Sequence, residues 1–232
     1  MTEHSRLRSL IYPFKVIAFP FRTFKEIASN LNSLKILPGF LLVIVLQLMT
    51  SLSIAYVRAS KIFLDSETNS VSLLTTDFLG TNIPPILLQG LLTLLLNWLT
   101  YGVLLLLIVR VFSQKRLPAN PSLIAIGYVF SVLVVSGVAT TLLISLLPEI
   151  HFDAAVWSSG PAEDIAKVYE AVWGPTLILQ VLNYFGLAFI FWLVILGAIV
   201  VNIAHEIKLT TAIMISFVAY FSSALITAFL SA

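Results

Sequence analysis

The sequence predicts an all-α, polytopic membrane protein: a bundle of five transmembrane helices, with interfacial amphipathic helices in its N-terminal arm and outer loop. Two observations carry this prediction. Hydrophobic residues make up 59% of the 232 residues and charged residues only 10%, whereas soluble domains carry roughly 25% charged residues. In addition, five long apolar runs are each bounded by charge or proline, and a helix of about 20 apolar residues crosses a bilayer.

The five predicted spans cover residues 37–57, 86–109, 122–147, 176–201 and 212–230. They lack the alternating pattern of barrel strands, and backbone amides in hydrocarbon must be satisfied within the segment, so each run is predicted to be a helix. We therefore expect a transmembrane domain over 37–232, preceded by a cytoplasmic arm over 1–36.

Flanking charges predict the direction of the spans. Ten of the 13 lysines and arginines fall on the side that holds the N-terminus, and eight of the 11 acidic residues fall on the other. By the positive-inside rule the basic side is cytoplasmic. Because five is odd, the C-terminus is expected outside.

The N-terminal arm has helical amphipathic spacing. Leu7, Leu10, Ile11 and Phe14 recur at helical intervals among Arg6, Arg8 and Lys15, which is typical of a helix lying on a membrane surface. After Pro20, Thr23 and Glu26 fit a capping box for a second such helix, with Phe24 and Ile27 on its apolar face. The arm is interpreted as an anchor that fixes topology, with a docking surface for anionic lipid or a protein partner as the alternative.

The long outer connection between the fourth and third spans is predicted to contain a helix. Pro161 and Glu163 suit a helix start. Ile165, Val168 and Tyr169 then share one face, and Trp173 ends the segment as an expected interface anchor. Asn120–Pro121 and Pro84–Pro85 are read as turns that introduce spans three and two.

No Asp, Glu, Lys, Arg or His lies deep inside any span, which argues against a proton relay or an ion-coupled carrier. Uncharged polar residues do occur there, and they form the candidate intramembrane path: Gln47, Asn97, Tyr101, Gln180 and Asn183. They could line a substrate route. The favoured interpretation is ordinary hydrogen bonding between helices.

Two weaker clusters involve charge. Arg110, His205 and Glu206 are expected at one depth near the inner surface, where structural pairing is favoured over a gate.

Glu149, His151 and Asp153 alternate in the outer loop, so an extended segment would place all three on one side. Such a set could bind a divalent metal, but one histidine with carboxylates in a polar loop is a weak signal, and the spacing matches no established metal motif. With no cysteine, phosphate loop or nucleophile motif present, we predict no metal site, no cofactor and no enzyme.

The order of several features resembles the YIP (Ypt-interacting protein) family of five-span membrane proteins. The resemblance covers about residue 20 to the C-terminus and rests on Pro20, Phe24, Ile27, the Gly127–Tyr128 pair, Trp192, Gly197 and the polar turn from His205 to Lys208. Ser131 and Val132 stand where family members often carry a proline, and the chain has no long acidic or proline-rich tail. It is most similar to the short prokaryotic members.

This resemblance implies a membrane scaffold or adaptor in the plasma membrane of a prokaryote. A small GTPase partner would follow only by analogy with eukaryotic members. Small residues at four-residue intervals in spans three and five allow close packing within the chain, with a second copy or with other membrane proteins; the modest net charge of +2 gives no reason to expect a nucleic-acid partner. The expected function is a non-catalytic scaffold or membrane-shaping protein, and the alternative is a small transporter, channel or lipid-handling protein.

Overall fold

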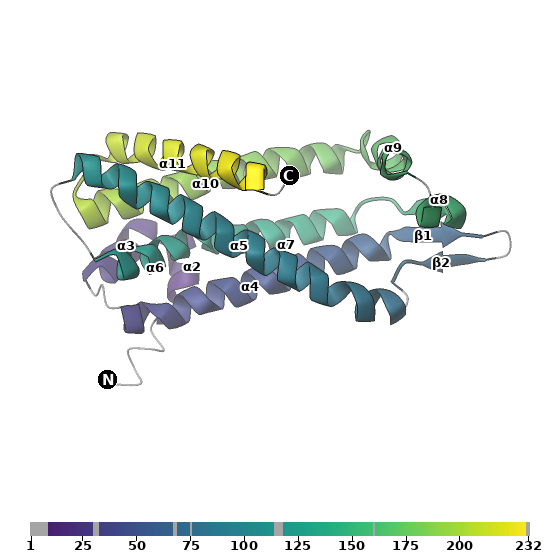
Figure 1. Cartoon of the computed structure of the whole chain (residues 1–232), viewed down its shortest axis with the longest axis horizontal. Coiled ribbons are helices and arrows are strands. Elements are labelled where there is room, and N and C mark those ends of the chain that lie inside the picture. Colours follow the sequence, from purple (N-terminus) through teal and green to yellow (C-terminus); the bar gives the residue numbers. More distant parts are fainter. Residues whose placement is uncertain are drawn as a thin grey trace. The chain divides into compact units, whose positions relative to one another are not determined.

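A computed structural model describes residues 9–29, 33–66, 69–74, 76–113, 118–159 and 161–230 of the chain (Figure 1). It is 84% helical. Five of the helical stretches within these residues are long and apolar enough to cross a membrane: Lys35–Ser60, Ile83–Phe112, Ala119–Ser145, Leu177–His205 and Leu209–Phe229. The all-α, polytopic class predicted from the sequence is confirmed.

Helices α4 (Ser33–Ser60), α5 (Thr76–Phe112), α10 (Leu177–His205) and α11 (Leu209–Leu230) are continuous. The third span is interrupted, since α6 (Ala119–Gly127) continues through the 3-10 turn η1 (Tyr128–Phe130) into α7 (Ser131–Ser145). The arm folds as α2 (Tyr12–Ala18) and α3 (Pro20–Ser29). The predicted arm residues Arg6, Leu7 and Arg8 lie outside the described residues.

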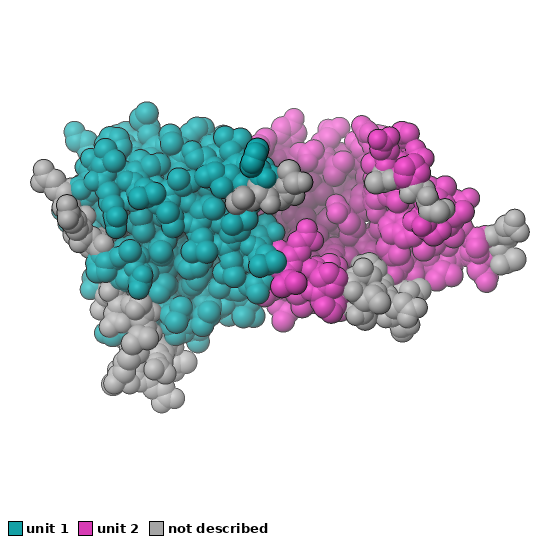
Figure 2. All heavy atoms as spheres, viewed as in Figure 1, with its two compact units in different colours: residues 1–47, 91–135, 189–232 teal, residues 48–90, 136–188 magenta. Residues whose placement is uncertain are grey.

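The chain forms two compact units (Figure 2). Unit 1 comprises residues 1–47, 91–135 and 189–232, and unit 2 comprises residues 48–90 and 136–188. Four of the long helical elements, α4, α5, α7 and α10, therefore contribute residues to both. The arm belongs to unit 1 together with parts of the spans.

Unit 1 has a continuous apolar core, because α2, α3 and the helices α4, α5, α6, α10 and α11 each turn one apolar face inward. Val16, Leu105, Tyr128 and Leu196 are among its fully buried side chains. The opposite faces of the spans stay apolar as well, and residues such as Phe229 at 86% exposure suit contact with lipid.

Two predicted helix starts are wrong. Pro84 and Pro85 lie inside α5, which begins at Thr76, so this pair is not a turn before the span. Thr23 is not an N-cap: α3 begins at Pro20, and the Thr23 hydroxyl donates to the carbonyl of Phe19, four residues earlier, at 2.9 Å. A threonine inside a helix bonds back in this way when its side chain is buried.

Unit 2 contains a small sheet that was not predicted. Strands β1 (Ile62–Asp65), β2 (Ser70–Ser72) and β3 (Ile150–Asp153) are ordered β2-β1-β3, with β2 antiparallel and β3 parallel to β1. Helices α8 (Ala154–Ser159) and α9 (Ala162–Trp173) contact β3. Strands of three or four residues carry too little periodicity to be recognised in sequence.

Helix α9 confirms the helix predicted in the outer connection, but its role differs. Ile165, Val168 and Tyr169 pack against a second core cluster around Phe152, and Trp173 is only 4% exposed. Trp173 is therefore a core residue of unit 2 and not the interface anchor that its position suggested.

Candidate functional site

The arm is seated on unit 1 by contacts along both of its helices. Helix α2 contacts η1, and α3 contacts α6. Val16, Phe24 and Ile27 are at most 2% exposed at these contacts, and the Tyr12 ring meets the Tyr128 ring edge-on at 6.0 Å. The arm is thus a packed part of the unit, whereas its amphipathic spacing predicted helices lying on the membrane surface.

A close approach of backbones fixes the start of the arm. A Cβ atom on Gly39 would lie 2.0 Å from the carbonyl oxygen of Ser9 and 2.2 Å from the Tyr128 hydroxyl oxygen. That hydroxyl donates a hydrogen bond to the carbonyl of Ile36 in α4. Only glycine leaves room for this three-way contact between the arm, α4 and η1.

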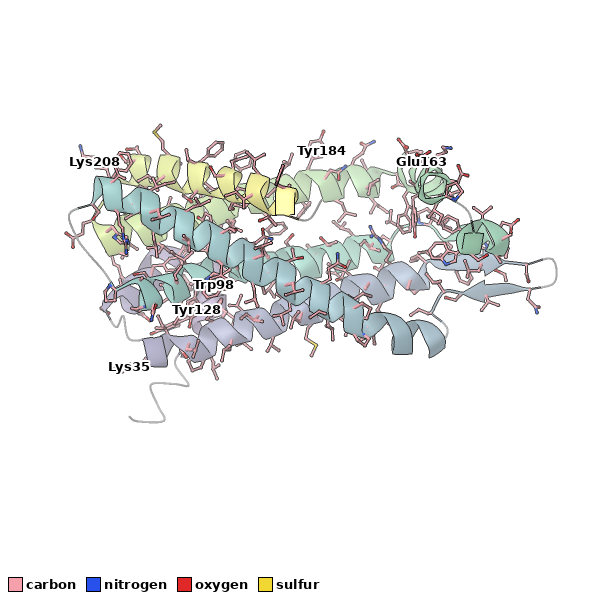
Figure 3. The ribbon with its side chains drawn as sticks, viewed as in Figure 1. Lys35, Trp98, Tyr128, Glu163, Tyr184 and Lys208 are labelled. Atoms are coloured by element: carbon pink, nitrogen blue, oxygen red, sulfur yellow. The ribbon has the colours of Figure 1, made fainter. Side chains whose placement is uncertain are left out.

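The centre of unit 1 is closed by a hydrogen-bonded chain. The Ser216 hydroxyl donates to the Val194 carbonyl at 2.7 Å, so the Tyr101 hydroxyl donates to Ser216, at 2.8 Å. Gly197 faces both hydroxyls, because its Cβ would lie 1.8 Å from the Tyr101 oxygen. Trp98, labelled in Figure 3, donates to the Leu123 carbonyl at 2.9 Å. Spans α5, α6, α10 and α11 are joined by these bonds.

The five residues of the candidate path differ in their surroundings. Tyr101 is 1% exposed and bonded to Ser216, as interhelical pairing predicts. Gln47 and Asn97 are half-buried in unit 1, whereas Gln180 and Asn183 are exposed on the part of α10 that belongs to unit 2. Tyr101 therefore serves packing.

The apolar cavity of unit 1 is small, at about 20 Å³. It lies under α3 and is lined mainly by Ile27, Leu105, Val109, Ile126 and Val201, with Ser122 and His205 as polar groups. None of the five path residues lines it. A volume of this size holds about one water molecule, so this cavity is no solute route.

The predicted inner cluster is only partly assembled. His205 and Glu206 line an open depression of about 490 Å³ together with Ser113, Lys208 and Thr211. Arg110 is exposed in the last turn of α5 and makes no ion pair with Glu206 in the described part of the chain. Glu206 has φ 57° and ends α10, and the Asn202 amide donates to the Ile207 carbonyl across that turn at 2.7 Å. These are features of a helix end.

On unit 2, β3 is extended, as the alternation of Glu149, His151 and Asp153 assumed. His151 lies 3.1 Å from a carboxylate oxygen of Asp65 on β1 and stacks on Phe63. Hydrogen bonds from Ser70 and then His151 lower the pKa of Asp65. No group of three His, Cys, Asp or Glu residues that could hold a metal is found within the described ranges.

The core of unit 2 includes an aromatic cluster. Phe152 packs against Trp157 and Tyr169, and Trp173 packs against Tyr169 at 5.1 Å. The Trp173 indole donates to the Pro148 carbonyl at 2.9 Å, and Arg58 lies 6.0 Å from its ring. Burial raises the pKa of Tyr169, with Arg58 acting in the opposite direction. The cluster ties α9 to the loop that precedes β3.

Sequence reasoning missed the glycines that make these contacts possible. Gly39 carried no signal of its own, Gly197 entered only through the family resemblance, and Gly127 entered through that resemblance and through its four-residue spacing from Ser131. A comparison of the chain with family models, curated proteins and solved structures finds no match. The site is thus described by its own geometry alone.

Proposed function

We propose that this protein is a non-catalytic membrane scaffold that shapes or organises the bilayer around it. The closed interior of unit 1 carries the proposal. The Tyr101 hydroxyl donates to Ser216, and the Ser216 hydroxyl donates to the Val194 carbonyl. The apolar cavity under α3 has room for about one water molecule. A bundle of this kind offers its surfaces to lipid and partners.

Two further observations support a role at surfaces. Unit 1 presents the arm, with Phe14, Phe19 and Phe21 exposed. Unit 2 contains a small sheet and the short helices α8 and α9, all formed by chain segments between the apolar runs. The resemblance to the YIP family remains a prediction that agrees with this function. A small GTPase partner is not part of the proposal.

Reconstituted vesicles test the function. We expect the protein to leave ion flux, small-solute flux and lipid scrambling at the rate of empty vesicles, because hydrogen bonds join the helices at the centre of unit 1 and the apolar cavity under α3 has room for about one water molecule. We also expect vesicle diameters, measured by cryo-electron microscopy, to fall as the protein-to-lipid ratio rises. Diameters that stay constant would contradict the shaping role.

Asn97→Leu separates the two functions that the sequence left open. Asn97 is half-buried in α5, and Asn183 is exposed on α10, so Asn183→Leu is its control. In a scaffold both variants behave as the parent protein. Flux or scrambling that Asn97→Leu abolishes and Asn183→Leu preserves would establish the transport function in place of the scaffold.

We further propose that the membrane is the plasma membrane, with the N-terminus in the cytoplasm and the C-terminus outside. The orientation rests on the unequal division of basic and acidic residues, and the choice of the plasma membrane rests on the resemblance to the short prokaryotic members of the YIP family. The chain has no cysteine, so single cysteines report topology without background. A cysteine at Ser159 should react with an impermeant maleimide on intact cells, and one at Gln114 should react only after lysis. The reverse pattern would invert the topology.

A further inference from the structure

We infer that the arm, defined as residues 9–29 with helices α2 and α3, is a one-leaflet wedge that binds anionic phospholipid. The inference rests on the proposed function and names the partner of its shaping surface. Three properties of the arm point to this partner: large apolar side chains that are exposed, an excess of cations beside them, and contact with the third span away from the end of that span.

The open face of the arm is aromatic. Phe14, Phe19 and Phe21 are 57%, 65% and 47% exposed, and Ile11 is 52% exposed. The buried face of the same helices is formed by Val16, Phe24 and Ile27, so the arm is apolar on two sides. An exposed apolar patch of this kind marks contact with lipid or protein.

The charges beside these aromatic residues select a lipid surface. Lys15, Arg22 and Lys25 are exposed, and one carboxylate, that of Glu26, lies among them. Glu26 is 3.8 Å from Lys15 and 3.6 Å from Arg22, while Lys25 forms no ion pair with any described residue. Three cations against one anion leave a net positive surface, which anionic headgroups complement.

Helix α2 packs on the third span inside its apolar run, Ala119–Ser145, and not at its end. Helix α6 begins at Ala119, and α2 packs on η1 through Tyr12 and Tyr128. At 1.5 Å per residue, Tyr128 lies about 13 Å along the helix from Ala119. An arm held there reaches below the headgroups, while lysine and arginine side chains extend back toward them.

The arm is also held in place before any lipid binds. Tyr128, bonded to Ile36, and the backbone contact of Ser9 with Gly39 fix it to α4 and η1. Lipid therefore meets a preformed surface, and the cost of folding the arm does not reduce the affinity. A wedge fixed in one leaflet expands that leaflet only, which is the asymmetry that membrane shaping requires.

The test is a lipid-quenching experiment on the full chain. Ala18 is exposed on α2, and Ala18→Cys provides a single site for a fluorophore. The labelled protein is reconstituted in phosphatidylcholine vesicles that contain doxyl-labelled phosphatidylcholine or doxyl-labelled phosphatidylglycerol. Each basic residue near an anionic surface favours that surface by about fivefold. We expect the phosphatidylglycerol probe to associate about 25-fold more strongly than the phosphatidylcholine probe, because Glu26 offsets one of the three cations and each of the two remaining charges contributes about fivefold.

The lipid ratio is the association of the phosphatidylglycerol probe divided by that of the phosphatidylcholine probe. Neutralising the three cations as Lys15→Gln, Arg22→Gln and Lys25→Gln should bring this ratio close to one. The control, Lys61→Gln with Lys167→Gln in unit 2, should leave it unchanged. Phe14→Ser with Phe21→Ser should weaken quenching by both lipids without removing the preference. A ratio near one in the parent protein, or a ratio that survives neutralisation, would overturn the lipid assignment. Vesicle narrowing without a lipid preference would overturn this inference alone, whereas solute flux would overturn the proposed function and leave the lipid ratio measurable.

Discussion

Gly197→Ala is expected to destabilise unit 1 by about 2–6 kcal/mol. The added Cβ would lie 1.8 Å from the Tyr101 hydroxyl oxygen and 2.6 Å from the Ser216 hydroxyl oxygen. The Tyr101 ring has no room to withdraw, because it is 1% exposed and meets Phe130 and Tyr220 edge-on. The estimate combines overpacking, which typically costs about 1–3 kcal/mol, with the loss of a buried hydrogen bond at about 1–3 kcal/mol. Unfolding of the purified protein by denaturing detergent measures the change.

The same helix provides the matched control. A Cβ on Gly186 in α10 would meet nothing within 4 Å, so Gly186→Ala should be neutral or stabilise the helix by up to about 1 kcal/mol. Adding Tyr101→Phe to Gly197→Ala removes the clashing oxygen and should recover part of the loss. Strictly additive effects of the two substitutions would show that the clash is not the cause.

The five spans were predictable because lipid imposes a strong constraint on sequence. A helix must satisfy its own backbone and must carry about 20 apolar residues, and both properties are visible in the chain alone. The position of a proline relative to the start of a span is less constrained. Pro84 and Pro85 look like a turn, yet α5 continues through them, since a membrane helix tolerates proline where other groups satisfy the freed carbonyls.

The side-chain packing within each unit was harder to predict from the sequence than the spans were. Gly127–Tyr128 entered only as part of a resemblance, and the structure gives the pair a physical role: a Cβ on Gly127 would lie 2.4 Å from the Phe40 ring, and Tyr128 bonds to α4. Such a role depends on a residue far away in the chain. Trp173 shows the same limit, because it is buried in the core of unit 2 with Phe152 and bonds to Pro148, residues that no local pattern connects to it.

Gly39→Ala is expected to release the arm from unit 1. The new Cβ would lie 2.0 Å from the Ser9 carbonyl oxygen and 2.2 Å from the Tyr128 hydroxyl oxygen. Neither can move freely, because one is backbone and the other is bonded to Ile36. We expect a loss of about 1–3 kcal/mol for overpacking. Hydrogen exchange should show faster exchange in α2 and α3, with the amides of α9 unchanged.

Gly90→Ala is the control for this substitution, since its Cβ would meet side chains only at ordinary distances, the nearest at 3.7 Å. Unchanged protection of α2 and α3 in Gly39→Ala would contradict the role given to the Ser9 contact. Gly39→Ala also separates the effect of the arm's packing on unit 1 from the effect of its charge, because this variant keeps Lys15, Arg22 and Lys25. If a fixed wedge recruits anionic lipid, Gly39→Ala should lower the preference for phosphatidylglycerol although every cation remains. A released arm must first be ordered at the membrane surface, and the free-energy cost of that ordering weakens lipid binding.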